Sequence, residues 1–216
     1  MKVTILDSES SVLNKFIGEI RDVTIQKDTM RFRRNIERIG EITAYELSKT
    51  LEFNSENVAT PLGTKKVQTP QKDIVICSIL RAGLPLHNGI LNYFDDAENA
   101  FISAYRKYIN ENEFEIKVEY FASPDLTNKV LILADPMLAT GRSLASVYEG
   151  LKQNGTPKEI HIACVIASTE GIDYIKNYFP ENTKLWVATV DDKLNEHGYI
   201  VPGLGDAGDL AFGKKL

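Results

Sequence analysis

Four continuous apolar runs constrain the fold of this chain more than any other feature. They are "IVICSIL" at 74–80, "VLILA" at 130–134, "IHIACVIA" at 160–167 and "LWVATV" at 185–190. A continuous apolar run of this length is typical of a strand that is covered on both faces, as in a parallel sheet. Helices are predicted between and beyond these runs, at 143–153 and near 170–178. The alternation predicts an α/β fold with a mainly parallel sheet.

The flanking segments extend this pattern. Further strands are predicted at 3–6, 100–105 and 115–121. A helix is predicted from Asp28 to about Leu51, with a largely apolar stripe facing inward. That stripe consists of Phe32, Ile36, Ile39, Thr43 and Leu47. The polar stretch 54–73 contains two prolines and a glycine, so it is predicted to be a connection or an edge hairpin.

Composition narrows the class of protein. The chain has 216 residues, enough for one domain or for one domain with a subdomain, and its formal net charge is −5. An acidic total gives no broad attraction to nucleic acid or to an anionic membrane. No apolar run reaches the roughly 18 residues of a membrane span, and the N-terminus is too polar for a signal peptide. A cytoplasmic protein is expected.

The cysteines and histidines do not suggest a metal or redox site. Cys77 and Cys164 lie inside apolar runs and are predicted to be buried free thiols. No spacing of cysteine and histidine resembles a zinc site. The histidines, His87, His161 and His197, lie far apart in the sequence, and no catalytic role is predicted for them.

The loop "DPMLATGRS" at 135–143 follows a buried strand and opens a helix. Pro136 disfavours the α region at Asp135, so the strand stays extended through the acid. Thr140, Gly141 and Ser143 are small enough to let backbone N–H groups point at an anion, to which the helix adds its positive N-terminal end. A phosphate cradle is therefore one interpretation, and a plain capped strand–helix turn is the other.

Two arginines follow predicted strands at the edge of the sheet where ligands of such folds bind. Arg81 precedes Gly83 in "LRAGLP", and Arg106 lies in "SAYRKY". Each guanidinium could donate a forked pair of hydrogen bonds to a phosphate, or it could form a surface salt bridge.

The C-terminal stretch "GYIVPGLGDAGDLAFG" has four glycines after Tyr199, with Asp206 and Asp209 among them. This density of glycine lets backbone groups approach a flat ligand closely, so the stretch could recognise a nucleobase by its hydrogen-bonding edge. The alternative is a flexible tail. The apolar Ile200, Val201 and Leu204 argue against that alternative because they favour burial.

Taken together, these segments resemble the uracil phosphoribosyltransferase family. The resemblance covers residues 21–46, 79–91, 104–107, 135–143 and 194–209. It implies a type I phosphoribosyltransferase α/β core with flanking helices and a hood over the base site. It further implies a single domain spanning residues 1–216, with a core of about 70–190. N-terminal helices at 10–52 and a tail at 191–216 would form the hood and the base site.

The resemblance also implies a reaction and its residues. Uracil and 5-phosphoribosyl 1-pyrophosphate would give uridine monophosphate and pyrophosphate. The residues implied for catalysis are Arg81, Arg106, Asp135 and Asp206. Those implied for binding the phosphoribosyl donor are Arg81, Arg106, Asp135, Pro136, Met137, Leu138, Ala139, Thr140, Gly141, Arg142, Ser143 and Asp206. Those implied for binding uracil are Ile200, Gly205, Asp206 and Ala207.

The implied cofactor is Mg²⁺, held mainly by the diphosphate of the donor, and no side chain is assigned as a direct metal ligand. The implied partners are the two small substrates and further copies of the chain, as a homodimer or a larger homo-oligomer, with no nucleic acid and no membrane. Water has to be excluded during transfer, and the stretch 106–118 is the candidate closing loop.

The chain departs from the family pattern at three positions. Arg142 stands where the phosphate loop usually has a second glycine, Leu210 where the tail usually has an arginine, and Pro85 follows "RAGL". The Arg142 side chain could fold over the donor or point to solvent. We favour the second interpretation, with an ordinary helical backbone at this position, because backbone amides can satisfy a phosphate unaided.

Two other functions on the same fold remain open at this point. The first is an RNA-binding pyrimidine regulator, for which the basic run Arg31, Arg33, Arg34 and Arg38 is the feature to test. The second is a nucleotide sensor without turnover. The acidic net charge and the complete C-terminal motif favour the enzyme.

Overall fold

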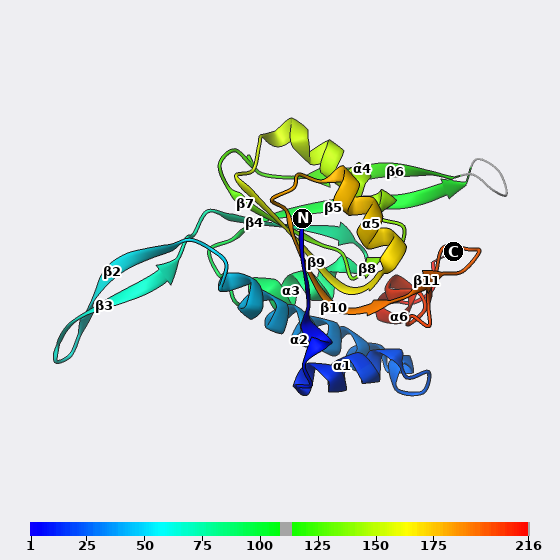
Figure 1. Ribbon diagram of the computed structural model, residues 1–216, viewed down its shortest axis with the longest axis horizontal. Coiled ribbons are helices and arrows are strands. Elements are labelled where there is room, and N and C mark those ends of the chain that lie inside the picture. The colour runs from blue at the N-terminus through cyan, green and yellow to red at the C-terminus, as the bar shows by residue number, and fades with distance from the viewer. Residues whose placement is uncertain (109–113, 216) are drawn as a thin grey trace.

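A mainly parallel sheet forms the centre of the molecule. The computed structural model describes residues 1–108 and 114–215, with only the backbone of 104–108 and 114–119. The strands of the sheet are β1 (Lys2–Ile5), β4 (Ile74–Leu80), β5 (Glu98–Tyr108), β6 (Phe114–Ala122), β7 (Val130–Ala134), β8 (Met137–Leu138), β9 (Glu159–Ser168) and β10 (Lys184–Asp191). Their order is β1-β10-β9-β7-β4-β5-β6, and β8 pairs with β9 (Figure 1). Every pair is parallel except β5 with β6.

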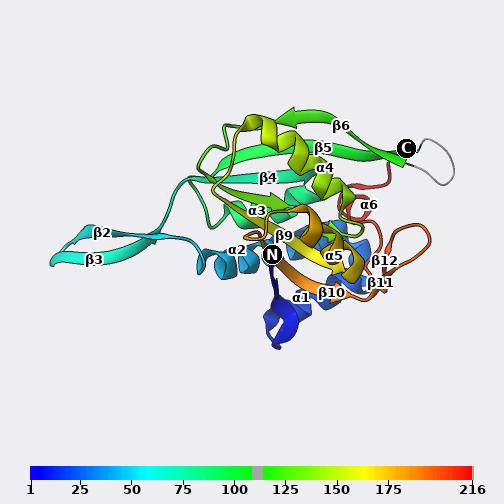
Figure 2. The ribbon, with the colours of Figure 1, turned by 45° about the horizontal axis from the view of Figure 1, so that its top comes forward.

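Helices cover both faces of this sheet. The α-helices are α1 (Val12–Arg21), α2 (Thr29–Ser48), α3 (Gly83–Leu91), α4 (Arg142–Leu151), α5 (Thr169–Tyr178) and α6 (Ala207–Phe212). Short 3-10 turns are η1 (Leu6–Ser8), η2 (Ile25–Lys27) and η3 (Lys152–Asn154). Figure 2 shows α1 and α2 on one side of the sheet and α4 and α5 on the other. The predicted α/β fold is confirmed.

Alternate residues of the central strands supply two separate cores. Ile74 and Ile76 of β4 pack in the core beneath α1, α2 and α3, whereas Val75 and Cys77 pack in the core beneath α4. This explains why the strand reads as a continuous apolar run, since both of its faces are buried. Cys77 and Cys164 are buried free thiols, as predicted.

The N-terminal helices also follow the sequence pattern. All five residues predicted for the inward stripe of α2 are buried. Asp28 caps this helix, its side chain accepting a hydrogen bond from the Arg31 N–H at 3.0 Å. The helix ends at Ser48 rather than near Leu51. Among the described residues, no helix is both long enough and apolar enough to cross a bilayer.

Most of the 54–73 stretch belongs to a hairpin, residues 53–70, that is separate from the main sheet. Strands β2 (Phe53–Thr60) and β3 (Gly63–Pro70) pair only with each other and project from the body of the molecule (Figure 1). Of the two predicted forms, the hairpin is therefore correct, but it lies on no edge of the sheet. All of β2 is exposed. A second small hairpin, β11 (Lys193–Leu194) with β12 (Ile200–Val201), lies in the C-terminal stretch.

Candidate active site

The carboxyl ends of β4 and β7 bring two of the predicted loops together. The strands are parallel neighbours, with Ser78 opposite Ala134, so Arg81 and Asp135 follow them at the same edge of the sheet. A methyl group placed on Gly83 would lie 2.9 Å from the Ala134 carbonyl oxygen, which shows how closely the loops pack. The peptide bond between Leu80 and Arg81 is cis.

The 135–143 loop turns sharply into α4 and encloses a small pocket, which leaves the phosphate cradle a prediction. Gly141 has a φ of +75°, which a residue with a side chain rarely adopts, and α4 begins at the next residue. A methyl group at Gly141 would also lie 2.8 Å from Cγ2 of Ile175 in α5. A small pocket of about 40 Å³ opens here. It is lined by Asp135, Met137, Leu138, Ala139, Thr140, Gly141, Ser143 and Leu144.

The N-terminus of α5 supports this loop. Ser168 caps α5 by accepting a hydrogen bond from the Gly171 N–H at 2.9 Å. Its hydroxyl also donates to the Ala139 carbonyl oxygen at 2.7 Å. A methyl group at Gly171 would lie 2.2 Å from that oxygen. Sequence reasoning missed both residues, although a serine three residues before a glycine at a predicted helix start is a signal of an N-cap.

Asp135 is a half-buried carboxyl, and few hydrogen bonds or charges offset the cost of burying it. It accepts one hydrogen bond, from the Met137 N–H at 3.2 Å. Among the residues that the structure describes, no lysine, arginine or histidine pairs with it. Burial raises the pKa of Asp135 to about 7, and the Met137 hydrogen bond opposes that rise only in part. A ligand that supplies hydroxyl donors or positive charge would complete this site.

Arg81 reaches from the end of β4 to the C-terminal stretch. Its Nη2 donates to Asp209 Oδ1 and to the Gly213 carbonyl oxygen, both at 3.1 Å. These bonds leave the Nε and Nη1 donors available, and the side chain is 43 % exposed. The salt bridge predicted as one alternative is therefore present. The three remaining N–H groups leave the second alternative, contact with an anion, as a prediction.

The C-terminal stretch is folded against the same edge. Ile200 and Leu204 are buried, which confirms the prediction that this is not a free tail. Asp206 caps α6 by accepting the Asp209 N–H at 2.9 Å. A methyl group at Gly208 would lie 3.9 Å from Nη2 of Arg81, so α6 and the Arg81 loop are neighbours. The residues assigned to the base site thus lie beside one assigned to the donor site.

The predictions for Arg106 and its neighbours fall largely on residues outside the description. The prediction that Arg106 follows the end of a strand is wrong, because its backbone lies within β5 opposite Ile116 of β6. Its side chain lies outside the described atoms. The candidate closing loop, 106–118, includes residues 109–113, which lie outside the described residues. Both assignments stay predictions.

The positions that depart from the family pattern fit the local structure. Arg142 is exposed and is the first residue of α4. Its φ is not positive, since Asn128 is the one residue other than glycine with a positive φ in the described part of the chain. The predicted helical backbone at Arg142 is therefore confirmed. Pro85 lies in the first turn of α3, where its missing N–H costs nothing. Leu210 packs against the core beneath α1 and α2.

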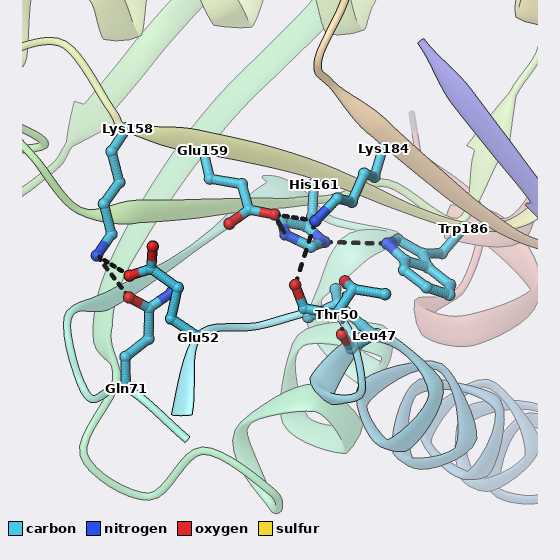
Figure 3. Close-up of polar contacts among 9 residues, drawn as sticks. All are labelled: Leu47, Thr50, Glu52, Gln71, Lys158, Glu159, His161, Lys184 and Trp186. Carbon is cyan, nitrogen blue, oxygen red and sulfur yellow. Dashed lines mark hydrogen bonds and ion pairs between the residues drawn. The ribbon is translucent and has the colours of Figure 1, made fainter. Parts of the chain in front are cut away.

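Two histidines are held in internal hydrogen-bond networks. His87 bonds to Ser78 Oγ and Asn99 Oδ1, each at 2.7 Å. His161 lies between Trp186 and Glu159 near the amino ends of β9 and β10 (Figure 3). Burial lowers the pKa of both, to about 4 for His161. Both side chains have structural roles.

The arginines of α2 are also engaged within the chain. Arg34 pairs with Glu37 at 2.7 Å, Arg33 donates to the Ala211 carbonyl oxygen at 2.7 Å, and Arg38 donates to Asn35 at 3.0 Å. Arg31 lies 3.5 Å from Glu19. These contacts show a helix face that is balanced by acids and amides rather than a uniform basic patch.

A family model described as uracil phosphoribosyltransferase matches residues 8–214. The chain belongs to the uracil phosphoribosyltransferase family. A relative with that name from Porphyromonas gingivalis is 57 % identical over 216 residues and covers 100 % of both chains. Another from Methanococcus vannielii is 42 % identical over 193 residues, which is 88 % of this chain and 82 % of the relative. The resemblance seen in the sequence is confirmed.

Solved structures share the fold of this chain. The AQ2163 protein from Aquifex aeolicus superimposes with a TM-score of 0.85 at 30 % identity, covering 98 % of each chain. A hypoxanthine phosphoribosyltransferase from Staphylococcus aureus matches with a TM-score of 0.50 at 15 % identity, covering 87 % of this chain and 84 % of its own. The second match supports the phosphoribosyltransferase fold alone.

Proposed function

We propose that this chain transfers the 5-phosphoribosyl group of 5-phosphoribosyl 1-pyrophosphate to uracil. The new bond joins N1 of uracil to the anomeric carbon, the bond from that carbon to the diphosphate oxygen breaks, and N1 loses its proton. The products are uridine monophosphate and diphosphate. One observation supports this most strongly: a helix-N-terminal pocket, an uncompensated carboxyl and the Arg81 loop meet at one edge of the sheet in a member of this family.

The 135–143 loop is the proposed site for the ribose 5′-phosphate. The pocket at the start of α4 offers backbone N–H groups and the positive end of the helix, and both favour a phosphate. The carboxylate of Asp135 would accept hydrogen bonds from the ribose hydroxyls. Positive charge develops on the ribose as the leaving group departs, and an ionised Asp135 would offset it. The family does not by itself assign these roles, so they stay proposals for this chain.

Arg81 is the proposed ligand of the departing diphosphate. Its Nη2 is already bonded to Asp209 and Gly213, which fixes the guanidinium and leaves Nε and Nη1 to donate to the anion. Arg106 is proposed as the second cationic ligand, from the sequence. Negative charge builds up on the diphosphate during transfer, so pre-positioned donors lower the barrier.

The C-terminal stretch is the proposed site for the base. Gly205 is exposed, whereas Ile200 and Ala207 are buried, so we expect backbone groups rather than side chains to meet the uracil edge. Cytosine presents a donor where uracil presents an acceptor. A backbone arranged for uracil would leave polar groups unpaired with cytosine, which costs several powers of ten in rate. Asp206 is proposed to face the donor as well.

Mg²⁺ is the proposed cofactor, bound mainly through the diphosphate. Mg²⁺ prefers oxygen ligands and commonly takes one or two carboxylates together with substrate phosphates. The carboxylates on the described part of this edge include Asp135, Asp206 and Asp209, which fit that pattern, although no side chain is assigned as a direct ligand. When bound, the ion would neutralise charge on the leaving group.

A homo-oligomer and a cytoplasmic location complete the proposal. Leu62 at the tip of the β2–β3 hairpin is fully exposed, and Phe53 and Val58 are more than 40 % exposed. A lone two-stranded hairpin is marginally stable in water, so contact with another copy would stabilise it.

The two buried free thiols suit a reducing compartment. Residues 1–216 are proposed to act as one domain.

The experiment that tests this function is release of diphosphate from the donor in the presence of Mg²⁺. We expect release that depends on uracil, with formation of uridine monophosphate, and much slower release with cytosine. The control omits the base. Binding of nucleotide without uracil-dependent release would favour a sensor, and comparable rates with cytosine would overturn the proposed base site. The comparisons support neither the sensor nor the RNA-binding regulator.

A further inference from the structure

A two-bond ion pair joins the first helix to the end of β10. Arg21 is the last residue of α1, and Asp191 is the last residue of β10. Nη1 of Arg21 donates to Asp191 Oδ2 at 2.8 Å, and Nη2 donates to Oδ1 at 2.7 Å. The exposed fractions of the two side chains are 22 % and 8 %. This paired geometry is rigid, because two parallel hydrogen bonds fix both planes.

The same pair holds both backbone polar groups of Gly203. Nη1 of Arg21 also donates to the Gly203 carbonyl oxygen at 3.0 Å. The Gly203 N–H donates to Asp191 Oδ2 at 2.8 Å. A segment 182 residues away from Arg21 in the sequence is thereby attached to α1 and β10 at one point.

Gly203 is the sharp turn within the stretch proposed to contact uracil. Its φ is +64°, and a methyl group there would lie 2.1 Å from the Ile200 carbonyl oxygen. Ile200 precedes this turn, and the exposed Gly205 and the α6 cap at Asp206 follow it. A shift of Gly203 would therefore move the backbone on both sides of the turn.

Asp191 is held in its ionised form beside Arg21, although its side chain is largely buried. Burial alone would raise the pKa of Asp191, but the hydrogen bonds from Arg21 and from the Gly203 N–H outweigh burial, so this pKa lies below its ordinary value. Buried ion pairs contribute little net stability because of their desolvation cost. A pair that also binds a turn through both of its backbone groups suits a positioning role better than a purely stabilising one.

We propose that Arg21 and Asp191 are positioning residues that set the uracil-contacting backbone through Gly203. This inference rests on the proposed function. It predicts a specific effect on one substrate: loss of the pair misplaces the backbone that reads uracil, whereas the donor loop at 135–143 keeps its own support from Ser168 and Gly171. Uracil should therefore bind more weakly while the donor binds as before.

The test compares kinetic constants of Arg21→Met, Arg21→Lys and Asp191→Asn with those of the wild-type chain. We expect Arg21→Met and Asp191→Asn to raise KM for uracil by about tenfold or more and to lower the preference for uracil over cytosine. KM for the donor should stay within about twofold. Arg21→Lys keeps the charge but cannot make two parallel bonds, so it should restore part of the uracil affinity.

Lys184→Met is the matched control, because it removes another ion pair of β10, the one with Glu159 at the opposite end of the strand. It should lower Tm without changing KM for uracil. If Arg21→Met does not fold, Arg21→Lys provides the test, since it retains the positive charge. An unchanged KM for uracil in folded variants, or an equal rise in both KM values, would refute the inference alone. A wild-type chain without uracil turnover would instead refute the proposed function, and this inference with it.

Discussion

The two ends of the parallel sheet each hold a half-buried carboxyl. The two carboxyls differ in their hydrogen-bond partners and in the direction in which their pKa is shifted. Asp135 follows the carboxyl end of β7, and its one partner in the described part of the chain is the Met137 N–H. Glu159 begins the neighbouring strand β9, where it bonds to Lys184 and to His161 Nε2, the latter at 2.9 Å. The pKa of Asp135 is raised to about 7 by burial. For Glu159, burial is outweighed by Lys184 and His161, and its pKa is lowered.

Glu159 has two partners from its own and the neighbouring strand, His161 and Lys184 (Figure 3). Trp186 Nε1 donates to His161 Nδ1 at 3.0 Å, so the imidazole proton lies on Nε2, which donates to Glu159. Lys184 Nζ donates to the Thr50 carbonyl oxygen at 3.3 Å, which connects the end of α2 to the sheet. Satisfied polar groups of this kind hold a fold together. Asp135 has one such partner in the described part of the chain, and we propose that a ligand supplies the others.

The largest expected effect comes from exchanging each carboxyl for an amide. Asp135→Asn should lower kcat on the order of a hundredfold, because in the proposed reaction the Asp135 carboxylate offsets the positive charge that develops on the ribose. Its Tm should not fall, because an ionised carboxyl without a cationic partner costs free energy in the folded state, and the amide removes that cost. Steady-state kinetics and thermal unfolding of the same samples check both effects.

Glu159→Gln is the counterpart at the other end of the sheet. It should leave kcat unchanged and lower stability by about 1–2 kcal/mol, or roughly 2–8 °C in Tm, because Lys184 and His161 lose a charged acceptor. A large loss of activity in Glu159→Gln, or a large loss of stability in Asp135→Asn, would contradict the assignment of activity to the Asp135 end of the sheet and stability to the Glu159 end.

Much of this contrast could be predicted from the sequence, and some of it could not. Continuous apolar runs predicted the buried parallel strands, and the polar loops after them predicted the position of Asp135 and Arg81. The support from Ser168 and Gly171 and the bonds of Arg21 to Gly203 join segments far apart in the chain. Local patterns contain no information on such partners. The β2–β3 hairpin was ambiguous for a different reason: β2 is exposed throughout, so its sequence has no alternation of buried and exposed residues.

Removal of Arg81 sharpens the comparison on the ligand side. Arg81→Ala should reduce turnover with the donor by about ten- to more than a hundredfold, equivalent to roughly 1.5–3 kcal/mol of a charge-assisted contact. Arg106→Ala should act similarly, on the sequence prediction. Lys184→Met removes a cation of the other end and should retain full turnover. Steady-state kinetics at varied donor concentration distinguish these outcomes. If kcat and KM for the donor are unchanged in Arg81→Ala, Arg81 has a structural role only.

The two ends should also respond to pH in opposite directions. The pKa of Asp135 is higher in the folded than in the unfolded chain, so its contribution to stability decreases as pH rises from about 4 to 7. The folded pKa of His161, about 4, lies below its ordinary value, so stability decreases as pH falls from about 6.5 to 4.

Denaturant unfolding between pH 4 and 8 checks these directions. The stability difference between wild type and Asp135→Asn should grow toward pH 7. In His161→Gln, the loss of stability toward acid pH should be smaller than in the wild type. A difference between wild type and Asp135→Asn that stays constant over this range would show that Asp135 keeps an ordinary pKa.

The smallest effect is expected at Arg142, which lies on the ligand side but is exposed. Arg142→Gly should change KM for the donor by less than about fivefold, under roughly 1 kcal/mol, because we propose that the backbone of the loop provides the phosphate contacts. Saturation kinetics with the donor measure this. A tenfold rise with unchanged Tm would make the Arg142 side chain a donor ligand.

The most direct test of the account is a crystal structure of the chain with uridine monophosphate bound. We expect the 5′-phosphate in the pocket at the start of α4, the ribose hydroxyls on Asp135 and the uracil edge against the backbone of residues 205–207. The Glu159 network at the other end of the sheet should be unchanged. A nucleotide bound elsewhere, with the 135–143 pocket empty, would contradict the account.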